Sequence, residues 1–420
     1  MPDQDNIPTR TSSLNVCLLT ETFHPETGGG ETQARVLASG LAASGAAVQV
    51  ITRRSDKMSP RRDCLGPVRL WRVSPTGAGQ LKKWGLVITA LIMLLRLRRS
   101  YDAIVVCGFR ILGIPAVIAA GLLKKPCLLK ADIRGELSGE YFRAGLQRFG
   151  LQPSGLLLRS LLKLRNCLLR RATGFVAIST AVETELVECG IGEEKISRIP
   201  NSVDTDRFCP VDEPTRTKLR QKLGIPCAGQ IAIYTGRLER TKGLPVLLSA
   251  WKNIASRHRD VRLLLVGAGG LGLHNCETEL RDFVAQNCLD QSVSFVGGVE
   301  NVHEYLQASD LFVFPSEREA FGISVIEAMA CSLPVITTTA GGLSDIVTAG
   351  QTAIVVPVGD VEALEAAIEG VLREEVRVRE LVAAGRELAI RKYSQSQILE
   401  QYARLLAKLH DANGEPGAAV

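Results

Sequence analysis

The sequence has few aromatic residues, and its cysteines and histidines form no close groups. Aromatic side chains make up 5% of 420 residues, and neither an RNA-binding nor a helix-turn-helix signature is present. Both absences argue against a nucleic-acid partner. The 11 cysteines include no C-x-x-C pair and the 5 histidines are scattered, which argues against a zinc site and a disulfide framework. Reduced thiols of this kind are typical of a cytosolic protein.

Apolar runs long enough to cross a bilayer are also lacking. Residues 85–95 form a run of about eleven apolar residues, whereas a membrane-spanning helix needs about twenty. Residues 156–171 are rich in leucine at helical spacing and also carry several Lys and Arg. This second stretch predicts either an amphipathic helix packed on a sheet or an interfacial helix attracted to anionic lipid. The polar residues 1–13 predict that no signal peptide precedes the first strand.

Charge is distributed unevenly along the chain. The net formal charge is +6, but residues 1–200 hold 28 Lys and Arg against 16 Asp and Glu, which is a net charge of +12. The remaining 22 basic and 28 acidic residues give a net charge of −6. A basic front half favours an anionic partner, either a membrane surface or a small molecule.

Short apolar strands alternate with helical patterns along both halves of the chain, as expected for parallel sheets. In the first half the predicted strands are 15–20, 47–52, 68–73, 103–107, 127–131, 174–178 and 196–199. In the second half they are 231–235, 262–266, 293–296, 311–314, 334–338 and 354–357. Residues 202–230 are interpreted as a linker, and helical segments at 374–392 and 396–410 close the chain. The predicted fold is therefore α/β, with two Rossmann-like doubly wound parallel-sheet domains facing each other across a cleft.

Glu319 and Glu327 bracket the turn that follows the predicted strand 311–314. The turn contains Phe321 and Gly322, and a helix is predicted from about Ile323. A strand that ends in a loop and feeds a helix N-terminus is where doubly wound folds bind phosphorylated ligands. Eight residues of helix span on the order of 10 Å. That separation suits the hydroxyls of an activated sugar at one carboxylate and the ribose of its nucleotide at the other.

Two further loops connect a predicted strand to a helix. Gly28, Gly29 and Gly30 open the first predicted helix, where backbone amides without a neighbouring Cβ can approach a phosphate or a sugar. Arg237 and Lys242 lie in the loop after the strand 231–235. An Arg can grip a diphosphate with two hydrogen bonds, and a Lys supplies a point charge. Taken alone, the glycine loop also fits a tight turn, and the loop with Arg237 and Lys242 also fits a solvated basic surface loop.

Two motif matches point to other functions and are set aside. Residues 267–272 fit G-x-G-x-x-G, which suggests a nicotinamide-dependent dehydrogenase, but the following strand ends in Gly297-Gly298 and not in the required acid. Asp204 and Asp206 have the D-x-D spacing of metal-dependent sugar transferases. They lie in the predicted linker and are interpreted as turn residues, so no metal site is predicted.

In this order the motifs resemble the family 4 retaining glycosyltransferases of GT-B fold, over about residues 14–410. The most specific element is E-x7-E at Glu319 and Glu327, followed by the Gly-Arg-Leu-x-x-x-Lys-Gly loop; other family-like segments are 28–31, 177–179, 200–204 and 341–342. The resemblance implies an acceptor-side domain at 1–200 and a nucleotide-sugar domain at 201–392. It also implies that 393–420 contain a C-terminal helix that returns to the first domain.

The resemblance assigns a role to each candidate site residue. Arg237 and Lys242 would neutralise the departing diphosphate, and Glu319 would bind the hydroxyls of the donor sugar, so these three are the predicted catalytic residues. Glu327 would accept the ribose hydroxyls. The other predicted donor contacts are Gly29, Gly30, Gly236, Phe321, Gly322 and Ile323.

The implied activity is transfer of a hexose from a nucleotide-diphosphate sugar, preferably of UDP or GDP, with retention and without a metal or other cofactor. The expected acceptor is a lipid-linked or polysaccharide glycan of cell-envelope or exopolysaccharide synthesis, reached from the cytoplasm or as a peripheral protein on the inner face of the membrane. Alternatives are an epimerase, a transferase with a small soluble acceptor, a non-catalytic GT-B protein that binds carbohydrate or a partner, and a redox Rossmann protein.

One segment departs from the family pattern. Family members often carry a His after the fifth front-domain strand, but residues 130–135 contain none. Asp132 or Arg134 is the candidate for its role.

Overall fold

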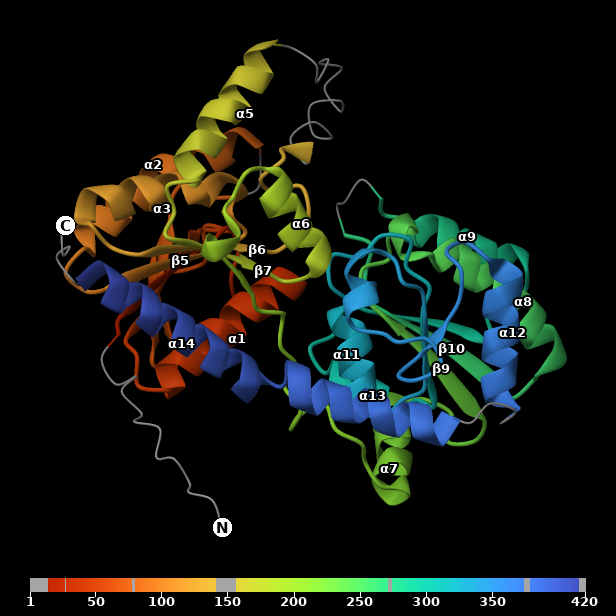
Figure 1. Cartoon of the computed structure of the whole chain (residues 1–420). Coiled ribbons are helices and arrows are strands. Elements are labelled where there is room, and N and C mark those ends of the chain that lie inside the picture. Colours follow the sequence, from red (N-terminus) through yellow and green to blue (C-terminus); the bar gives the residue numbers. More distant parts are fainter. Residues whose placement is uncertain are drawn as a thin grey trace. The chain divides into compact units, whose positions relative to one another are not determined.

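The computed structural model describes residues 14–26, 28–77, 80–140, 156–270, 274–373 and 378–414 (Figure 1). The chain divides into two compact units. Unit 1 comprises Met1–Pro200 and Ile398–Val420, and unit 2 comprises Asn201–Gln397. Each unit is built around one sheet.

Unit 1 contains an eight-stranded sheet with the strand order β3-β4-β2-β1-β5-β6-β7-β8. All neighbouring strands are parallel except β3 and β4. The strands are β1 (Val16–Thr20), β2 (Val48–Arg53), β3 (Arg62–Leu65), β4 (Val68–Val73), β5 (Ala103–Cys107), β6 (Cys127–Ala131), β7 (Gly174–Ala177) and β8 (Ile196–Arg198). The strand order reverses between β1 and β5, and doubly wound sheets bind ligands at the carboxyl ends of strands at such a point.

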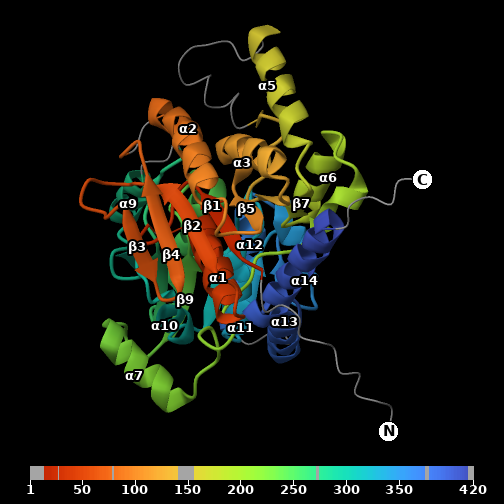
Figure 2. The same cartoon turned by 90° about the vertical axis from the view of Figure 1, so that its left-hand side faces the viewer.

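Helices cover both faces of this sheet (Figures 1 and 2). The helices α1 (Gly29–Ala43) and α14 (Gln395–Gly414) contribute apolar side chains to the core on one face. On the other face α2 (Gln80–Arg96) packs against α3 (Phe109–Leu123), which in turn contacts α5 (Leu156–Leu169). The helix α6 (Thr180–Glu188) and the short 3-10 helix η1 (Glu193–Lys195) connect β7 to β8.

The helix α14 belongs to the core of unit 1 although it is the last element of the chain. Ile398, Tyr402 and Leu406 are spaced by four residues and are each at most 3% exposed. A Cβ added at Gly40 would lie 2.2 Å from Leu399 Cδ1, so the absence of a side chain in α1 allows α14 to approach closely. The last helix therefore completes the sheet packing of the first unit.

Unit 2 contains a six-stranded parallel sheet with the order β11-β10-β9-β12-β13-β14. Its strands are β9 (Gln230–Thr235), β10 (Val261–Val266), β11 (Val293–Gly297), β12 (Leu311–Phe314), β13 (Val335–Thr337) and β14 (Ile354–Val355). Its helices are α7 (Glu213–Leu223), α8 (Leu244–Arg257), α9 (Glu277–Gln286), α10 (Val302–Gln307), α11 (Ile323–Ala330), α12 (Val361–Leu372) and α13 (Val378–Tyr393). Two short 3-10 helices are η2 (Arg240–Lys242) and η3 (Gly341–Asp345). The strand order reverses between β9 and β12.

The predicted α/β fold with two parallel-sheet domains is confirmed, and every predicted strand has a counterpart. The edge strand β3 was not predicted, because its side chains are mostly exposed and give no apolar run. The interpretation of 202–230 as a linker was wrong in part, since it contains α7. Asp212 caps this helix by accepting a hydrogen bond from Thr215 N at 3.0 Å, and the buried Arg220 pairs with Asp310 at 2.7 Å.

The leucine-rich helix α5 does not bury all of its leucine side. Leu161 and Leu164 are 55% and 70% exposed, whereas Arg165 is only 8% exposed. The inward side of the helix is therefore partly cationic at this point. Within the described ranges, every helix is too short or too polar to cross a membrane.

Candidate functional site

Two loops of unit 2 meet where the strand order of its sheet reverses. The first follows β9 and includes η2, and the second follows β12 and leads into α11. Glu317 N donates a hydrogen bond to Thr241 O at 3.0 Å. A Cβ at Gly243, whose φ is 71°, would lie 1.9 Å from Pro315 O. Only glycine allows this contact, so the Lys-Gly pair of the motif serves the packing of the two loops.

Lys242 and Glu319 form the ion pair at the centre of this site. Lys242 Nζ lies 2.6 Å from Glu319 Oε2, and the two side chains are 12% and 14% exposed. Glu319 Oε1 also accepts hydrogen bonds from the backbone amides of Ala320 at 3.0 Å and Phe321 at 3.4 Å. The carboxylate is thus held by a cation on one oxygen and by its own turn on the other. Because exposure to water is limited, the attraction between these two charges is stronger than it would be in a fully solvated pair.

Arg237 has a different partner. Its guanidinium lies 2.6 Å from Glu239 Oε1 and its side chain is 71% exposed. Its backbone carbonyl accepts a hydrogen bond from the buried Tyr234 hydroxyl at 2.8 Å. Gly236 precedes it with a φ of 148°, and a Cβ there would lie 2.8 Å from the Tyr234 hydroxyl. The structure therefore anchors the backbone of Arg237 and leaves most of its side chain in solvent.

The loop between β12 and α11 contains further predicted site residues. Gly322 has a φ of 109° and caps α11, and a Cβ there would lie 2.5 Å from Leu343 Cδ2. Phe321 is buried against Tyr393 in an edge-to-face contact with ring centroids 5.8 Å apart. Ile323 is the first residue of α11. The amides of this turn lie at a helix N-terminus, where the helix dipole favours an anion.

Glu327 lies one turn further along α11 and is half-buried. Removal from water raises the pKa of its carboxyl to about 7, and the positive charge of Arg207 opposes this shift. Its charge environment differs from that of Glu319, which is paired with Lys242. In its ionised form Glu327 can accept hydrogen bonds from hydroxyl groups.

The predicted residues of the front half lie in unit 1. Gly29 and Gly30 are the first residues of α1, while Thr27 lies outside the described residues. A Cβ at Gly30 would be 3.7 Å from Asp132 Oδ2, so the glycine turn and the loop after β6 are neighbours. Arg134 is an exposed residue of the same loop as Asp132.

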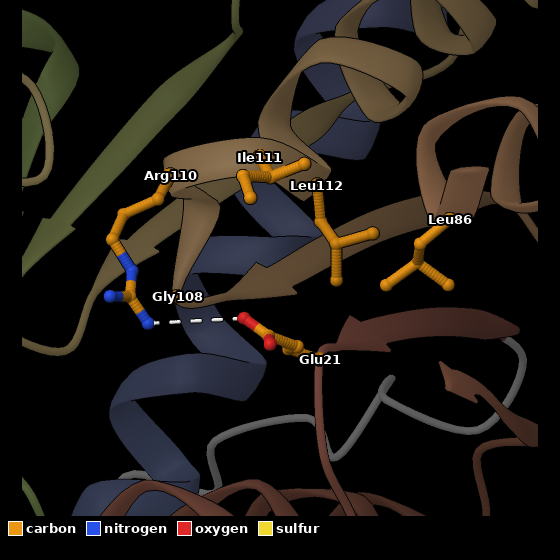
Figure 3. Close-up of a pocket in the computed structure, with 6 residues that line it drawn as sticks. All are labelled: Glu21, Leu86, Gly108, Arg110, Ile111 and Leu112. Atoms are coloured by element: carbon orange, nitrogen blue, oxygen red, sulfur yellow. Dashed lines mark ion pairs between the residues drawn. The ribbon is translucent and has the colours of Figure 1, made fainter. Parts of the chain in front are cut away.

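A small pocket opens in unit 1 at the carboxyl ends of β1 and β5 (Figure 3). It is lined by Glu21, Leu86, Gly108, Arg110, Ile111 and Leu112. Arg110 and Glu21 point toward each other across it, with 4.0 Å between a guanidinium nitrogen and a carboxylate oxygen. This pocket was not predicted from the sequence, although a glycine between a buried strand and a helix could have indicated it.

Two interpretations of motifs can be compared with the structure. Asp204 Oδ1 accepts hydrogen bonds from Asp206 N at 3.3 Å and Arg207 N at 3.1 Å, which confirms the turn interpretation of this D-x-D match. In the described part of the chain, no cluster of three or more His, Cys, Asp or Glu side chains has the arrangement to hold a metal ion.

Comparison with known proteins identifies the family. A model described as "Glycosyltransferase Family 4" matches residues 27–207, and one described as "Glycosyl transferases group 1" matches residues 215–388. Sucrose-phosphate synthase from Thermosynechococcus elongatus has a similar structure, with a TM-score of 0.78 and 25% identity over 95% of this chain and 100% of that chain. The chain belongs to the family 4 glycosyltransferases and has the GT-B fold, as its motifs predicted.

Curated relatives match over part of their length. Mannosylfructose-phosphate synthase of Agrobacterium fabrum is 33% identical over 44% of this chain and 42% of its own. Alpha-maltose-1-phosphate synthase of Mycolicibacterium smegmatis is 29% identical over 57% and 64%. Thus the chain spans about half the length of these relatives. The structure of Anabaena HepE in complex with UDP-glucose has a TM-score of 0.73 and 22% identity, over 94% of this chain and 100% of that chain, and shows the shared fold.

Proposed function

We propose that the protein is a retaining glycosyltransferase that moves a sugar from a nucleotide-diphosphate sugar to a hydroxyl group without a metal. The observation that carries the proposal is the Lys242–Glu319 pair beside the N-terminus of α11. It combines a cation for a phosphate, a carboxylate for hydroxyl groups and backbone amides at a helix dipole. These are the groups that a sugar diphosphate needs.

Each charged residue of the site has one task in this proposal. Lys242 and the exposed Arg237 offset the negative charge that develops on the departing diphosphate, with the amides of Gly322 and Ile323 acting on the same charge. Glu319 accepts hydrogen bonds from hydroxyls of the donor sugar, and Glu327 accepts those of the ribose. Donor binding then exchanges part of the Lys242–Glu319 contact for contacts to the donor.

The chemical step needs no covalent enzyme intermediate. The bond between the anomeric carbon and the phosphate oxygen breaks, and the electron pair leaves with the diphosphate. An acceptor oxygen attacks the anomeric carbon from the face that the diphosphate leaves, and its proton passes to the departing phosphate oxygen. The fixed charges of Lys242 and Arg237 stabilise the transition state, and each well-aimed contact of this kind contributes about 3–4 kcal/mol.

Uridine diphosphate sugars are the first donors to test, with those of guanosine diphosphate second. The similarity to a fold that binds UDP-glucose in HepE supports this order. The decisive measurement is the melting temperature of wild-type protein with UDP, GDP, ADP and dTDP and with their sugars. A ligand at 100 times its Kd stabilises the folded state by about 2.7 kcal/mol. The proposal fails if none of these nucleotides raises the melting temperature.

A lipid-linked glycan is the proposed acceptor, and the inner membrane surface the proposed location. Residues 1–200 have a net charge of +12, and α2 exposes Trp84, Ile88 and Ile92 at helical spacing. Arginine residues at the end of that helix complement anionic lipid. One relative is a lipopolysaccharide core biosynthesis mannosyltransferase of Rhizobium meliloti.

Flotation with anionic and neutral vesicles tests this location, and absence from both vesicle fractions contradicts it. A soluble sugar phosphate is the second candidate acceptor, because sugar-phosphate synthases are among the relatives. Product analysis separates a transferase from an epimerase, which changes the nucleotide sugar without an acceptor.

A further inference from the structure

The helices on one side of the sheet in unit 1 have an apolar outer surface. Figures 1 and 2 show α2, α3 and α5 on the side of the sheet opposite to α1 and α14. In the described part of the chain ten large apolar side chains are exposed, and six of them lie on these three helices. The six are Trp84, Ile88, Ile92, Leu122, Leu161 and Leu164. Exposed apolar side chains gathered on one side of a protein indicate a surface that binds an apolar partner.

Helix α2 is apolar on both its inner and its outer side. Leu86, Ala90 and Leu94 recur every four residues and are at most 1% exposed, so they pack against the protein. Ile88 and Ile92 recur with the same spacing but are 63% and 44% exposed. A helix that packs on the protein with one side and faces water with the other is expected to be polar on its outer side. The outer side of α2 is therefore suited to a partner other than water.

Helix α3 shows the same property over its whole length. Arg110 is its one charged residue. The other residues that this helix leaves half-buried or exposed are Ile111, Ile114, Ile118, Gly121, Leu122 and Leu123. A helix that is apolar all round normally lies in a protein core or in contact with lipid. The packing of α3 against α2 and α5 covers only part of this apolar surface.

The helices on the other side of the same sheet provide a comparison. Helix α14 buries Ile398, Tyr402 and Leu406, and it carries Glu400 and Arg404 on its outer side, where they form an exposed ion pair. A polar outer side of this kind is normal for a helix that faces water. The apolar outer surface therefore belongs to one side of unit 1 and is not a general property of its helices.

The same three helices are rich in cations. Residues 80–100, 109–125 and 156–171, which contain the helices and the residues that follow them, hold 13 Lys and Arg and no Asp or Glu. Exposed cations after α2, after α3 and on α5 are Arg98, Arg99, Lys124, Arg159 and Lys163. A surface of one charge sign attracts a partner of the opposite sign. The partner of this surface therefore combines apolar groups with negative charge.

Charge and polarity together decide which class of partner fits. Two copies of this surface would bring cations against cations, which disfavours a dimer through these helices. A nucleic acid offers phosphate groups but no aliphatic surface to cover the Ile and Leu side chains. An anionic bilayer offers both phosphate groups and acyl chains. At its interface Trp and Leu side chains enter the acyl region, while Lys and Arg reach the lipid headgroups.

We infer that the outer surface of α2, α3 and α5 is a membrane-contact surface, which inserts its exposed Trp, Ile and Leu side chains into the interface of an anionic bilayer. The inference rests on the proposed membrane location. It adds which side of unit 1 meets the lipid, and that apolar insertion as well as charge holds the protein there. Leu86 of α2 and Ile111 and Leu112 of α3 also line the pocket of unit 1, so a lipid-linked acceptor would approach this pocket along the same helices.

Flotation of the full chain with vesicles of phosphatidylcholine, with and without phosphatidylglycerol, measures the contribution of these side chains. Wild-type protein should bind the vesicles that contain phosphatidylglycerol. The double variant Ile88→Ser/Ile92→Ser and the double variant Leu161→Ser/Leu164→Ser should each lower the partition coefficient about tenfold or more, because the lost side chains no longer gain free energy by leaving water.

Exposed apolar residues of unit 2 supply the matched control. Val358 and Ile390 are 51% and 41% exposed, and the double variant Val358→Ser/Ile390→Ser should bind vesicles like wild type. Salt separates the two contributions to binding, because it screens charges but does not weaken apolar insertion. Part of the wild-type protein should therefore stay on the vesicles at high salt.

The fluorescence of Trp84 tests insertion directly. Trp84 is 53% exposed, whereas Trp251 is buried and Trp71 is half-buried. Vesicles with bromine on the lipid acyl chains should quench the fluorescence of wild-type protein, and this quenching should largely disappear in Trp84→Phe. Adsorption by charge alone would leave the emission of Trp84 unquenched.

Three results overturn the inference and leave the proposed location intact: both Ser pairs on α2 and α5 bind like wild type, high salt releases the protein completely, or brominated lipid does not quench Trp84. Absence of wild-type protein from both vesicle fractions contradicts the location and this surface together. If a Ser pair does not fold, quenching of Trp84 in wild-type protein decides. Nucleotide stabilisation is measured separately, so failure of the proposed sugar transfer is distinguishable from failure of this inference.

Discussion

The two units use charged side chains at the ends of their strands in different ways. In unit 2 the pair Lys242–Glu319 stands at the strand-order reversal with both side chains partly accessible. In unit 1 the loop after β6 is instead held by buried charges such as Lys130 and Glu136, and Asp132 is the accessible one among Lys130, Asp132 and Glu136. The same sheet architecture can therefore present charge to a ligand or use it to fix a backbone, depending on the loops.

The largest expected effect comes from removing the cation that pairs with Glu319 in unit 2. Lys242→Ala should lower kcat/KM for sugar transfer by about 10²–10³-fold, because it removes a preorganised charge from the leaving group. Steady-state kinetics with the donor identified by thermal shift measure it. Lys252→Ala, an exposed lysine of α8, is the control and should react like wild type. Equal rates for the two variants would contradict the role of Lys242.

A second change in unit 2 tests nucleotide recognition. Glu327→Ala should weaken binding of the stabilising nucleotide about tenfold or more, since a carboxylate hydrogen bond to the ribose contributes about 1.5–3 kcal/mol. The increase in melting temperature on adding nucleotide should then largely disappear. Glu362→Ala, on the exposed side of α12, should keep it. A full nucleotide effect in Glu327→Ala would remove Glu327 from the donor site.

The pH dependence of stability compares one buried acid from each unit. The pKa of Glu136 and that of Glu327 are both raised from 4.5 to about 7, so the folded protein binds more protons than the unfolded chain between these values. Each acid therefore lowers the free energy of unfolding as pH rises from 4.5 to 7, by up to about 3 kcal/mol. Glu136→Gln and Glu327→Gln should each flatten part of this slope.

Urea unfolding at pH 5 and pH 7.5 measures both contributions. Because the two acids lie in different units, the double variant should show the sum of the two effects. An unchanged slope in either single variant would show that its acid is not held in the neutral form.

The smallest expected effects concern two helical glycines of unit 1. Gly40→Ala places a Cβ 2.2 Å from Leu399 Cδ1, so α14 must shift, and the free energy of unfolding should fall by about 1–3 kcal/mol. Gly121→Ala, in α3, has open space around the new Cβ and should raise it by about 0.5–1 kcal/mol. If thermal unfolding gives changes in the free energy of unfolding that have opposite signs for the two variants, contact with α14, and not helix propensity, determines the effect at Gly40.

Patterns of buried residues were predictable from the sequence, whereas contacts between charged residues were not. Strands such as Leu311–Phe314 and Ala103–Cys107 are continuous apolar runs, so their positions followed directly. The spacing from Glu319 to Glu327 located a strand–turn–helix junction. The same spacing gave no sign that Glu319 would pair with Lys242, which is distant in the chain.

Misplaced expectations had a common cause. Helix α7 was missed because its residues are mostly polar, and its one buried charge, Arg220, is stabilised by Asp310 of a distant loop. The exposed Leu161 and the buried Arg165 of α5 reverse the usual order of burial, because loop carbonyls compensate the guanidinium. A hydrophobicity pattern records average preferences and contains no information on such distant partners.

By itself, the sequence determined the class of fold, the alternation of strands and helices, and the family, because these depend on local periodicity and on residues close together in the chain. Only the tertiary structure decided that Lys242 contacts Glu319, that Arg237 turns to Glu239, and that buried charges fix the loop carrying Asp132. The physical reason is that ionic contacts between separate loops depend on where the sheet brings the strand ends together.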